Sequence, residues 1–147
     1  MTHARQQIRE AAAALLTGLT TTGTRVHQSR LPYVSLGDAE LPALLVVTND
    51  ESVEPHTIGS GLERRLTLTV SGLAKTGTNL DDTLDTIAAE VETAIGAART
   101  LGGKCTDIRL TSLRVGIDTS LETDVGRVDL EYEVLYFTNA GAPGTLI

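Results

Sequence analysis

The stretch RVDLEYEVLYF, residues 127–137, alternates apolar and polar side chains along almost its whole length. Successive side chains of a strand point to opposite faces of a sheet, so this pattern predicts a strand with one buried face and one polar face. The buried set comprises Val128, Leu130, Tyr132, Val134 and Tyr136. The polar set comprises Arg127, Asp129, Glu131 and Glu133. We therefore expect a sheet that is covered by other elements on one face.

Other segments of the chain predict further strands. Residues 64–73 alternate in the same way, and residues 106–117 alternate with a change of parity midway. One added residue near Thr111 and Ser112 would reconcile the two halves, which predicts a β-bulge there. The run ALLVVT, residues 43–48, is continuously apolar and predicts a strand in the interior of the sheet. A short strand is expected at residues 24–28.

Two segments have the spacing of amphipathic helices. Residues 3–19 place their apolar side chains on one face. Residues 79–99 carry a second apolar stripe, formed by Leu80, Leu84, Ile87, Ala88, Val91 and Ile95. Thr78 or Asn79 is the expected N-cap of this second helix, and acidic residues follow in its first turns, where the helix dipole favours negative charge.

The order of these elements predicts an α+β fold, with a mainly antiparallel sheet of four to five strands and two helices packed on one face. Residues 1–138 are expected to form a single domain, and residues 139–147 a flexible C-terminal tail. Residues 49–61 combine acids, a proline and glycines without periodicity, which predicts the main loop. Residues 118–126 predict a second polar loop.

Composition excludes several classes of function. The chain of 147 residues has a net charge of −7 and only two lysines, so we expect no sequence-specific binding to nucleic acid. No segment approaches the roughly 20 apolar residues of a membrane span, and the N-terminal segment lacks the apolar run of a signal peptide. An intracellular, reducing compartment is expected. Cys105 is the single cysteine, which excludes an intrachain disulfide.

Motifs for catalysis and metal binding are missing from the sequence. The three histidines, His3, His27 and His56, do not have the spacing of metal ligands, and no nucleophile elbow or phosphate-binding loop occurs. We therefore expect no enzyme, no metal and no cofactor. The alternative is a small-molecule-binding or enzymatic domain whose site would include His27, Tyr33 and Asp38.

The charged residues of the predicted strands suggest an assembly surface. Asp129, Glu131 and Glu133 repel one another unless a neighbouring strand supplies cations. Arg64 and Arg65, or Arg109 and Arg114, would supply them within the subunit, whereas arginines of a neighbouring subunit would supply them in an oligomer. The candidate assembly interface comprises Asp50, Glu51, Glu54, Arg64, Arg65, Asp129, Glu131 and Glu133.

In the order of its elements the chain resembles the tail-terminator proteins of long-tailed bacteriophages, the family of the lambda minor tail protein U. The stretches that carry the resemblance are LPALLV (residues 41–46), the charged loop at 49–61, RLTLTV (65–70) and LDTIAAEV (84–91). The resemblance implies a structural protein without catalytic activity. Such a protein forms a ring, usually a hexamer, that caps the tail tube, stops its polymerisation and presents a surface for head joining.

The resemblance also implies the partners and the location. The partners would be copies of the chain itself, the tail tube protein and a head-completion or connector protein. The location would be the virion tail, assembled in the host cytoplasm. A head–tail connector or tail-completion protein of related fold is the alternative within this class.

Overall fold

A computed structural model describes residues 2–28, 41–118 and 125–147 of the chain. The elements are α1 (Ala4–Leu16), β1 (Val26–His27), β2 (Ala43–Pro55), β3 (Gly61–Lys75), α2 (Leu80–Gly96), β4 (Asp107–Asp118), β5 (Val125–Asn139) and β6 (Ala142–Leu146). Both helices are shorter than expected at each end. Asn79 is the N-cap of α2, but its side chain makes no capping hydrogen bond.

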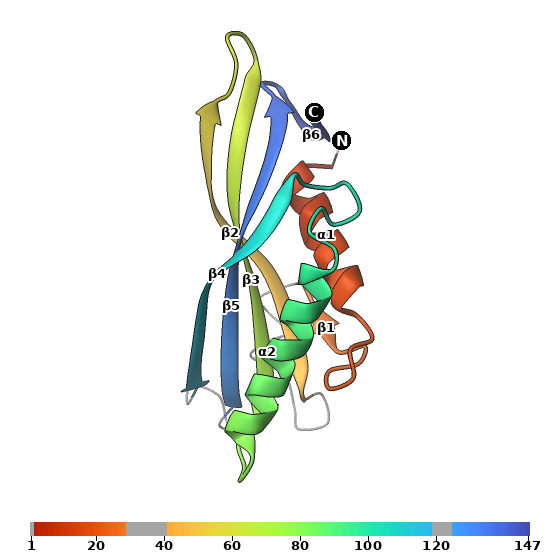
Figure 1. The fold of residues 1–147 in the computed structure, drawn as a ribbon, viewed down its shortest axis with the longest axis vertical. Coiled ribbons are helices and arrows are strands. Elements are labelled where there is room, and N and C mark those ends of the chain that lie inside the picture. The colour runs from red at the N-terminus through yellow and green to blue at the C-terminus, as the bar shows by residue number, and fades with distance from the viewer. Residues whose placement is uncertain (1, 29–40, 119–124) are drawn as a thin grey trace.

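The described strands form one six-stranded sheet in the order β1-β2-β3-β5-β4, with β6 paired to β5. Every pair is antiparallel except β1 with β2. The sheet is strongly twisted, and both helices lie against the same face (Figure 1). The predicted α+β class and the helices on one face are confirmed, while the described sheet has one strand more than the upper limit expected.

The core lies between the helices and the sheet. On β5 the even-numbered residues from Val128 to Tyr136 are buried, and the odd-numbered residues between them are partly exposed. The buried side chains of α2 are Leu84, Ile87, Ala88, Val91 and Ile95. The face of β5 predicted to be buried is therefore confirmed, as is most of the predicted stripe of α2.

A glycine in the sheet lets α2 approach closely. Gly72 on β3 lies in register between Leu44 on β2 and Val128 on β5. A Cβ at this position would lie 2.6 Å from Ile87 Cγ2 and 3.0 Å from Val128 Cγ1. The absence of a side chain thus makes room for the helix to lie against the sheet.

β2 and β4 each contain an irregularity in their pairing. The register of β4 shifts between Leu110 and Ser112, which confirms the predicted bulge. A second shift, between Thr48 and Glu51, interrupts β2 where it turns from a buried into an exposed strand. Bulges of this kind increase the local twist of the strand pair.

The prediction of a loop at residues 49–61 is wrong for most of its length. β2 continues to Pro55 and β3 begins at Gly61, so only residues 56–60 connect them. The polar half of β2 lies at an edge of the sheet, where water reaches it, so the segment has the composition of a loop. The bulge also breaks the alternation of side chains that would have indicated a strand. Of the second predicted loop, residues 119–124 lie outside the described residues.

The segment expected to be a flexible tail contains a strand. Residues Ala142–Leu146 form β6, which pairs with β5. α1 also contacts this strand, since Gln7 donates from Nε2 to the carbonyl oxygen of Gly144 at 3.0 Å. Five residues that include a proline and a glycine show no clear alternation, which is why the sequence pattern did not indicate a strand here.

Candidate assembly surface

The sheet face that points away from the helices carries a row of charged and polar side chains, which we call the polar face. It comprises Arg65 and Thr67 on β3, Arg109 and Arg114 on β4, and Arg127, Asp129, Glu131 and Glu133 on β5. The antiparallel register produces this grouping. Thr67 lies opposite Glu133, which in turn lies opposite Arg109, and Arg114 lies opposite Asp129.

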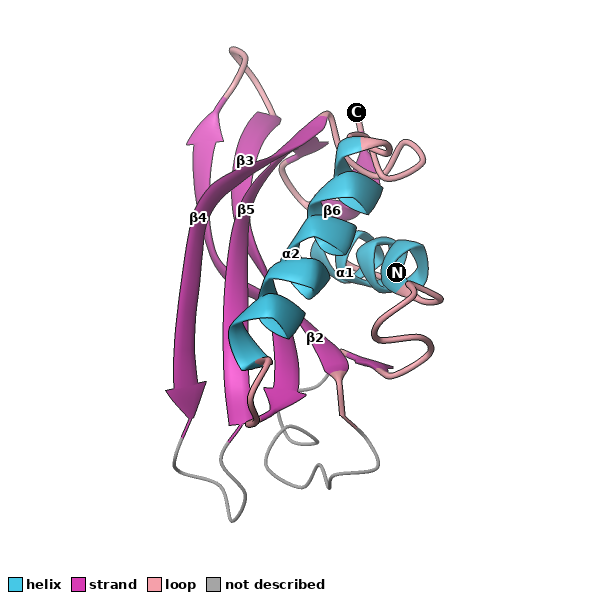
Figure 2. Ribbon diagram, turned by 60° about the horizontal axis from the view of Figure 1, so that its bottom comes forward, coloured by secondary structure: helices cyan, strands magenta, loops and turns pink. Residues whose placement is uncertain are grey.

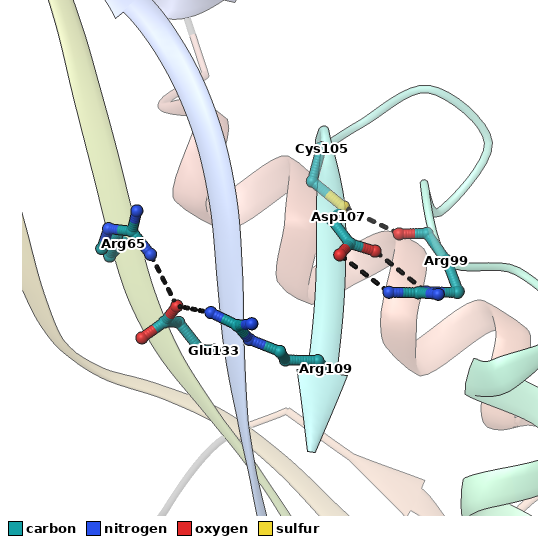
Figure 3. A network of polar contacts seen from close by, with 6 residues as sticks. All are labelled: Arg65, Arg99, Cys105, Asp107, Arg109 and Glu133. Carbon is teal, nitrogen blue, oxygen red and sulfur yellow. Dashed lines mark hydrogen bonds and ion pairs between the residues drawn. The ribbon is translucent and has the colours of Figure 1, made fainter. Parts of the chain in front are cut away.

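Glu133 is paired with arginines of its own subunit. Its Oε1 atom lies 2.8 Å from Arg65 Nη1 and 3.2 Å from Arg109 Nη2, so one carboxylate oxygen accepts from both neighbouring strands (Figure 3). The hydrogen bond from Arg109 lowers the pKa of Glu133; partial burial opposes this shift, and the hydrogen bond from Arg65 adds to it. For Glu133, the countercharge therefore comes from within the subunit.

The other two acids of this row differ from each other. Asp129 accepts hydrogen bonds from Ser71 Oγ at 2.6 Å and from Arg127 Nε at 3.0 Å. Glu131 makes no ion pair with any residue that the structure describes. It lines an open pocket of about 600 Å³ together with Thr48, Asn49, Asp50 and Thr67. The pocket therefore places two carboxylates, those of Asp50 and Glu131, along its wall.

Two residues of the candidate interface lie on the opposite face of the sheet and are largely shielded from solvent. Arg64 Nη1 is 3.0 Å from Glu51 Oε2, and the two side chains are only 12% and 7% exposed. The phenolic group of Tyr136 also donates to Glu51, and Arg64 Nε donates to Thr138 Oγ1 at 2.9 Å. These groups satisfy one another inside the subunit, so they offer little to an external partner.

Asp50 and Glu54 lie on the exposed outer half of β2. Neither forms an ion pair within the described part of the chain. The structure therefore separates the eight candidate residues into an internal pair, a row on the polar face and two free acids near one edge of the sheet. The sequence pattern did not reveal these groups because it placed residues 50–54 in a loop, where strand faces are not defined.

The sequence interpretation missed an exposed apolar stripe on β4. Its members are Leu110, Leu113, Val115 and Ile117, with exposed fractions of 36%, 43%, 51% and 61%. Their register partners on β5 include Tyr132, Leu130 and Val128, all buried on the helix-bearing face. β4 lies at the margin of the sheet, away from α1 (Figure 2). The alternation of these residues was visible in the sequence. The sequence did not indicate that α2 leaves their side chains exposed.

The described structure gives little support to the alternative of a small-molecule or catalytic site. The Nε2 atom of His27 is buried and has no hydrogen-bond partner within the described structure, while Tyr33 and Asp38 lie outside the described residues. No group of three or more histidine, cysteine or acidic side chains in residues 2–28, 41–118 and 125–147 is arranged to hold a metal ion. Of the helices described, none has the length and apolar character needed to cross a membrane.

Comparison with known proteins finds likeness in structure alone. No family model matches the chain, and no curated protein matches it. A chain in the solved structure "Virion of native gene transfer agent (GTA) particle" is similar over 90% of both chains, with 18% sequence identity and a TM-score of 0.34. A TM-score this low identifies no family, so the function has to be inferred from the residues of the chain itself.

Proposed function

We propose that this chain is a structural protein of a phage-type particle, and that it caps the tail tube as a ring. In this role it stops the polymerisation of tube subunits and then provides the surface for head joining. Its partners are copies of itself, the tail tube protein and a head-completion protein, and its place is the virion tail. It acts by assembly rather than by catalysis.

The observation that carries the proposal is the exposed stripe on β4. Three neighbouring positions, Leu113, Val115 and Ile117, hold large apolar side chains that are 43–61% exposed. Burying one such side chain fully is worth roughly 1.5–3 kcal/mol, so a row of them favours contact with another protein chain. The resemblance in element order to tail-terminator proteins supplies the kind of assembly.

The charge of the subunit is compatible with controlled assembly. A net charge of −7 keeps the free chain soluble and opposes indiscriminate association.

Electron microscopy of particles that lack this protein tests the proposal. Overlong, headless tails are expected, and complementation with the wild-type protein should restore the normal length. Normal-length tails that fail to join heads would instead support a head–tail connector or tail-completion protein. Sedimentation of the purified chain should show monomers that form rings at high concentration or with added tube. A stable dimer at every concentration would contradict the ring.

A further inference from the structure

We propose that copies of this chain join edge to edge, with β4 of one copy paired to the outer half of β2 of the next and Arg109 beside the neighbour's Asp50. This inference rests on the proposed ring, and it names the two surfaces that build it. The occupant of each edge is a second copy of the same chain.

Both edges are unpaired in the part of the subunit that the structure describes. β4 pairs with β5 on one side only. β1 pairs with β2 only at Leu44 and Leu45, so beyond that point β2 pairs with β3 alone. The free sides present backbone N–H and C=O groups that another strand can satisfy.

The strand directions allow the two edges to pair. β2 is antiparallel to β3, β3 to β5 and β5 to β4, so β2 and β4 of one subunit run in opposite directions. A neighbouring copy placed with its strands in the same orientation therefore presents its β2 antiparallel to β4. The two edges differ, so the contact is heterologous and can be repeated around a ring.

The charges of the two edges are complementary. β4 carries Arg109 and Arg114 and two acids, Asp107 and Asp118. Asp107 is already held by Arg99 through hydrogen bonds of 2.9 and 2.8 Å, and Arg109, which is exposed, lies 3.2 Å from Glu133 of its own subunit (Figure 3). β2 has no basic residue, and the acids Asp50 and Glu54 on its outer half form no ion pair with residues 2–28, 41–118 or 125–147. Contact between the two edges therefore brings opposite charges together.

The register gives a specific meeting point. Asp50 and Thr67 line the same pocket, and Thr67 lies in register with Glu133 and then with Arg109. Asp50 and Arg109 thus end one row that crosses the polar face. When two copies dock at the same height, this row continues from the Arg109 of one into the Asp50 of the next.

The apolar residues on the other face of the sheet lie at different heights along the two edges. Val53, 45% exposed, pairs in register with Arg64, whose partner on β5 is the buried Tyr136. Val53 thus belongs to the helix-bearing face, as does the exposed stripe of β4. With Asp50 beside Arg109, Leu110 is the member of the stripe that lies beside the outer half of β2. Leu113 and Val115 lie level with Val46 and Leu44 on the inner half, where β1 pairs. Edge pairing through the outer half of β2 would therefore shield Leu110 from water and leave the rest of the stripe exposed.

Disulfide trapping tests the pairing in the full-length chain. In a Cys105→Ser background, Asp50→Cys and Arg109→Cys are combined and the protein is oxidised. Paired strands bring opposite Cα atoms to about 4.5–5.5 Å, within the span of a disulfide. We expect a ladder of covalent multimers from the double variant and none from either single variant. Asp85→Cys combined with Arg109→Cys is the matched control, because Asp85 is exposed on α2, and it should give no ladder.

The outcomes separate this inference from the proposed function. A ladder together with normal tails in particles that lack the protein would support the edge pairing and overturn the tail cap. Overlong tails without a ladder would overturn the edge pairing and leave the cap. Dimers of the Arg109→Cys single variant would show β4 pairing with β4, which also overturns the inference.

Charge reversal gives a second measurement without cysteine chemistry. Asp50→Arg should weaken association about tenfold, because it places two cations at the junction. Adding Arg109→Asp to the same chain should restore most of this loss. If the wild-type chain, the single variant and the double variant all self-associate equally strongly, the contact between Asp50 and Arg109 is contradicted.

Discussion

Tyr136 at the centre of the sheet donates its phenolic hydrogen to the carboxylate of Glu51, near the edge. The same carboxylate lies 3.0 Å from Arg64 Nη1, so β2, β3 and β5 are joined by one cluster of side chains. Burial, reinforced by the negative charge of Glu51, raises the pKa of Tyr136, which keeps the phenol protonated as a donor. The cluster fixes the outer half of β2 to the sheet.

Replacing Glu51 with alanine should destabilise the fold. The substitution leaves Arg64 and the Tyr136 hydroxyl without their shared acceptor in a largely buried place. Removing one partner of such a pair typically costs about 3 kcal/mol or more in the free energy of unfolding. Urea denaturation measures the loss. Glu54→Ala, at an exposed position on the same strand, should stay within about 0.5 kcal/mol of the wild type. Equal losses for both variants would show that the cluster adds no stability.

The ion pairs of Glu133 predict a dependence of stability on acid. The pKa of this carboxyl in the folded chain is lowered from its ordinary value of 4.5, chiefly by the hydrogen bond from Arg109. As the pH falls below 4.5 the unfolded chain takes up a proton first, so the stabilisation is present above that pH and is lost as the pH falls through the folded pKa. The gap in urea midpoint between wild type and Glu133→Gln should therefore be largest at neutral pH and close in acid. Glu54→Gln serves as the control, and a gap independent of pH would rule out this linkage.

The two glycines that touch α2 should respond differently to an added methyl group. Gly72→Ala places a Cβ 2.6 Å from Ile87 Cγ2, inside a packed core of branched side chains, and should cost about 1–3 kcal/mol. Gly126→Ala meets the flexible end of Leu80 at 2.4 Å, and Leu80 is only partly buried, so it can move aside. Thermal unfolding of both variants should rank Gly72→Ala as the less stable. The reverse order would mean that α2 does not lie against Gly72 as described.

Polar substitution in the β4 stripe should affect association and spare the fold. Ile117→Thr removes an apolar contact from a side chain that is 61% exposed, so the free energy of unfolding of the monomer should change by less than about 0.5 kcal/mol. The association constant for ring formation, measured by sedimentation, should fall about tenfold, in line with the burial of one apolar side chain. Ile147→Thr is the matched control, since Ile147 is 60% exposed and lies at the C-terminus. Unchanged assembly of the Ile117→Thr variant would exclude the stripe from the interface.

The single thiol should be inert in the folded protein. Cys105 is 7% exposed, and burial raises its pKa to about 11. Its Sγ atom lies 3.6 Å from the carbonyl oxygen of Arg99 (Figure 3). A disulfide-exchange reagent at pH 8 should label the native chain slowly, and one thiol per chain rapidly in urea. Rapid labelling of the native chain would indicate that the start of β4 opens readily.

The sequence pattern was most informative where one face of an element is buried. Most of the stripe of α2 and the alternation of β5 follow a regular period and are confirmed, and so is the bulge where the period of β4 changes parity. The pattern failed for the exposed outer half of β2. The outer half of β2 is polar because water reaches it, which gives it the composition of a loop.

The candidate surface was predicted only as a set of charges. Alternation placed Asp129, Glu131 and Glu133 on one face, but strand order decides which arginines stand beside them. β5 lies between β3 and β4, and that order gives Glu133 its two partners. The exposure of Ile117 depends likewise on how far α2 extends across the sheet, which no local pattern encodes.

Both helices thicken the subunit on one face of the sheet, and in the described part of the chain no helix lies on the other face (Figure 2). Blocks of that shape, joined side by side through their margins, can close into a ring that curves with the helical side outward. In a ring closed in this way the helices would form the outer wall and the polar face would line the bore. The thickness of the helical layer would then help to set the bore diameter, and a cross-section of the assembled ring with the helices innermost would contradict this geometry.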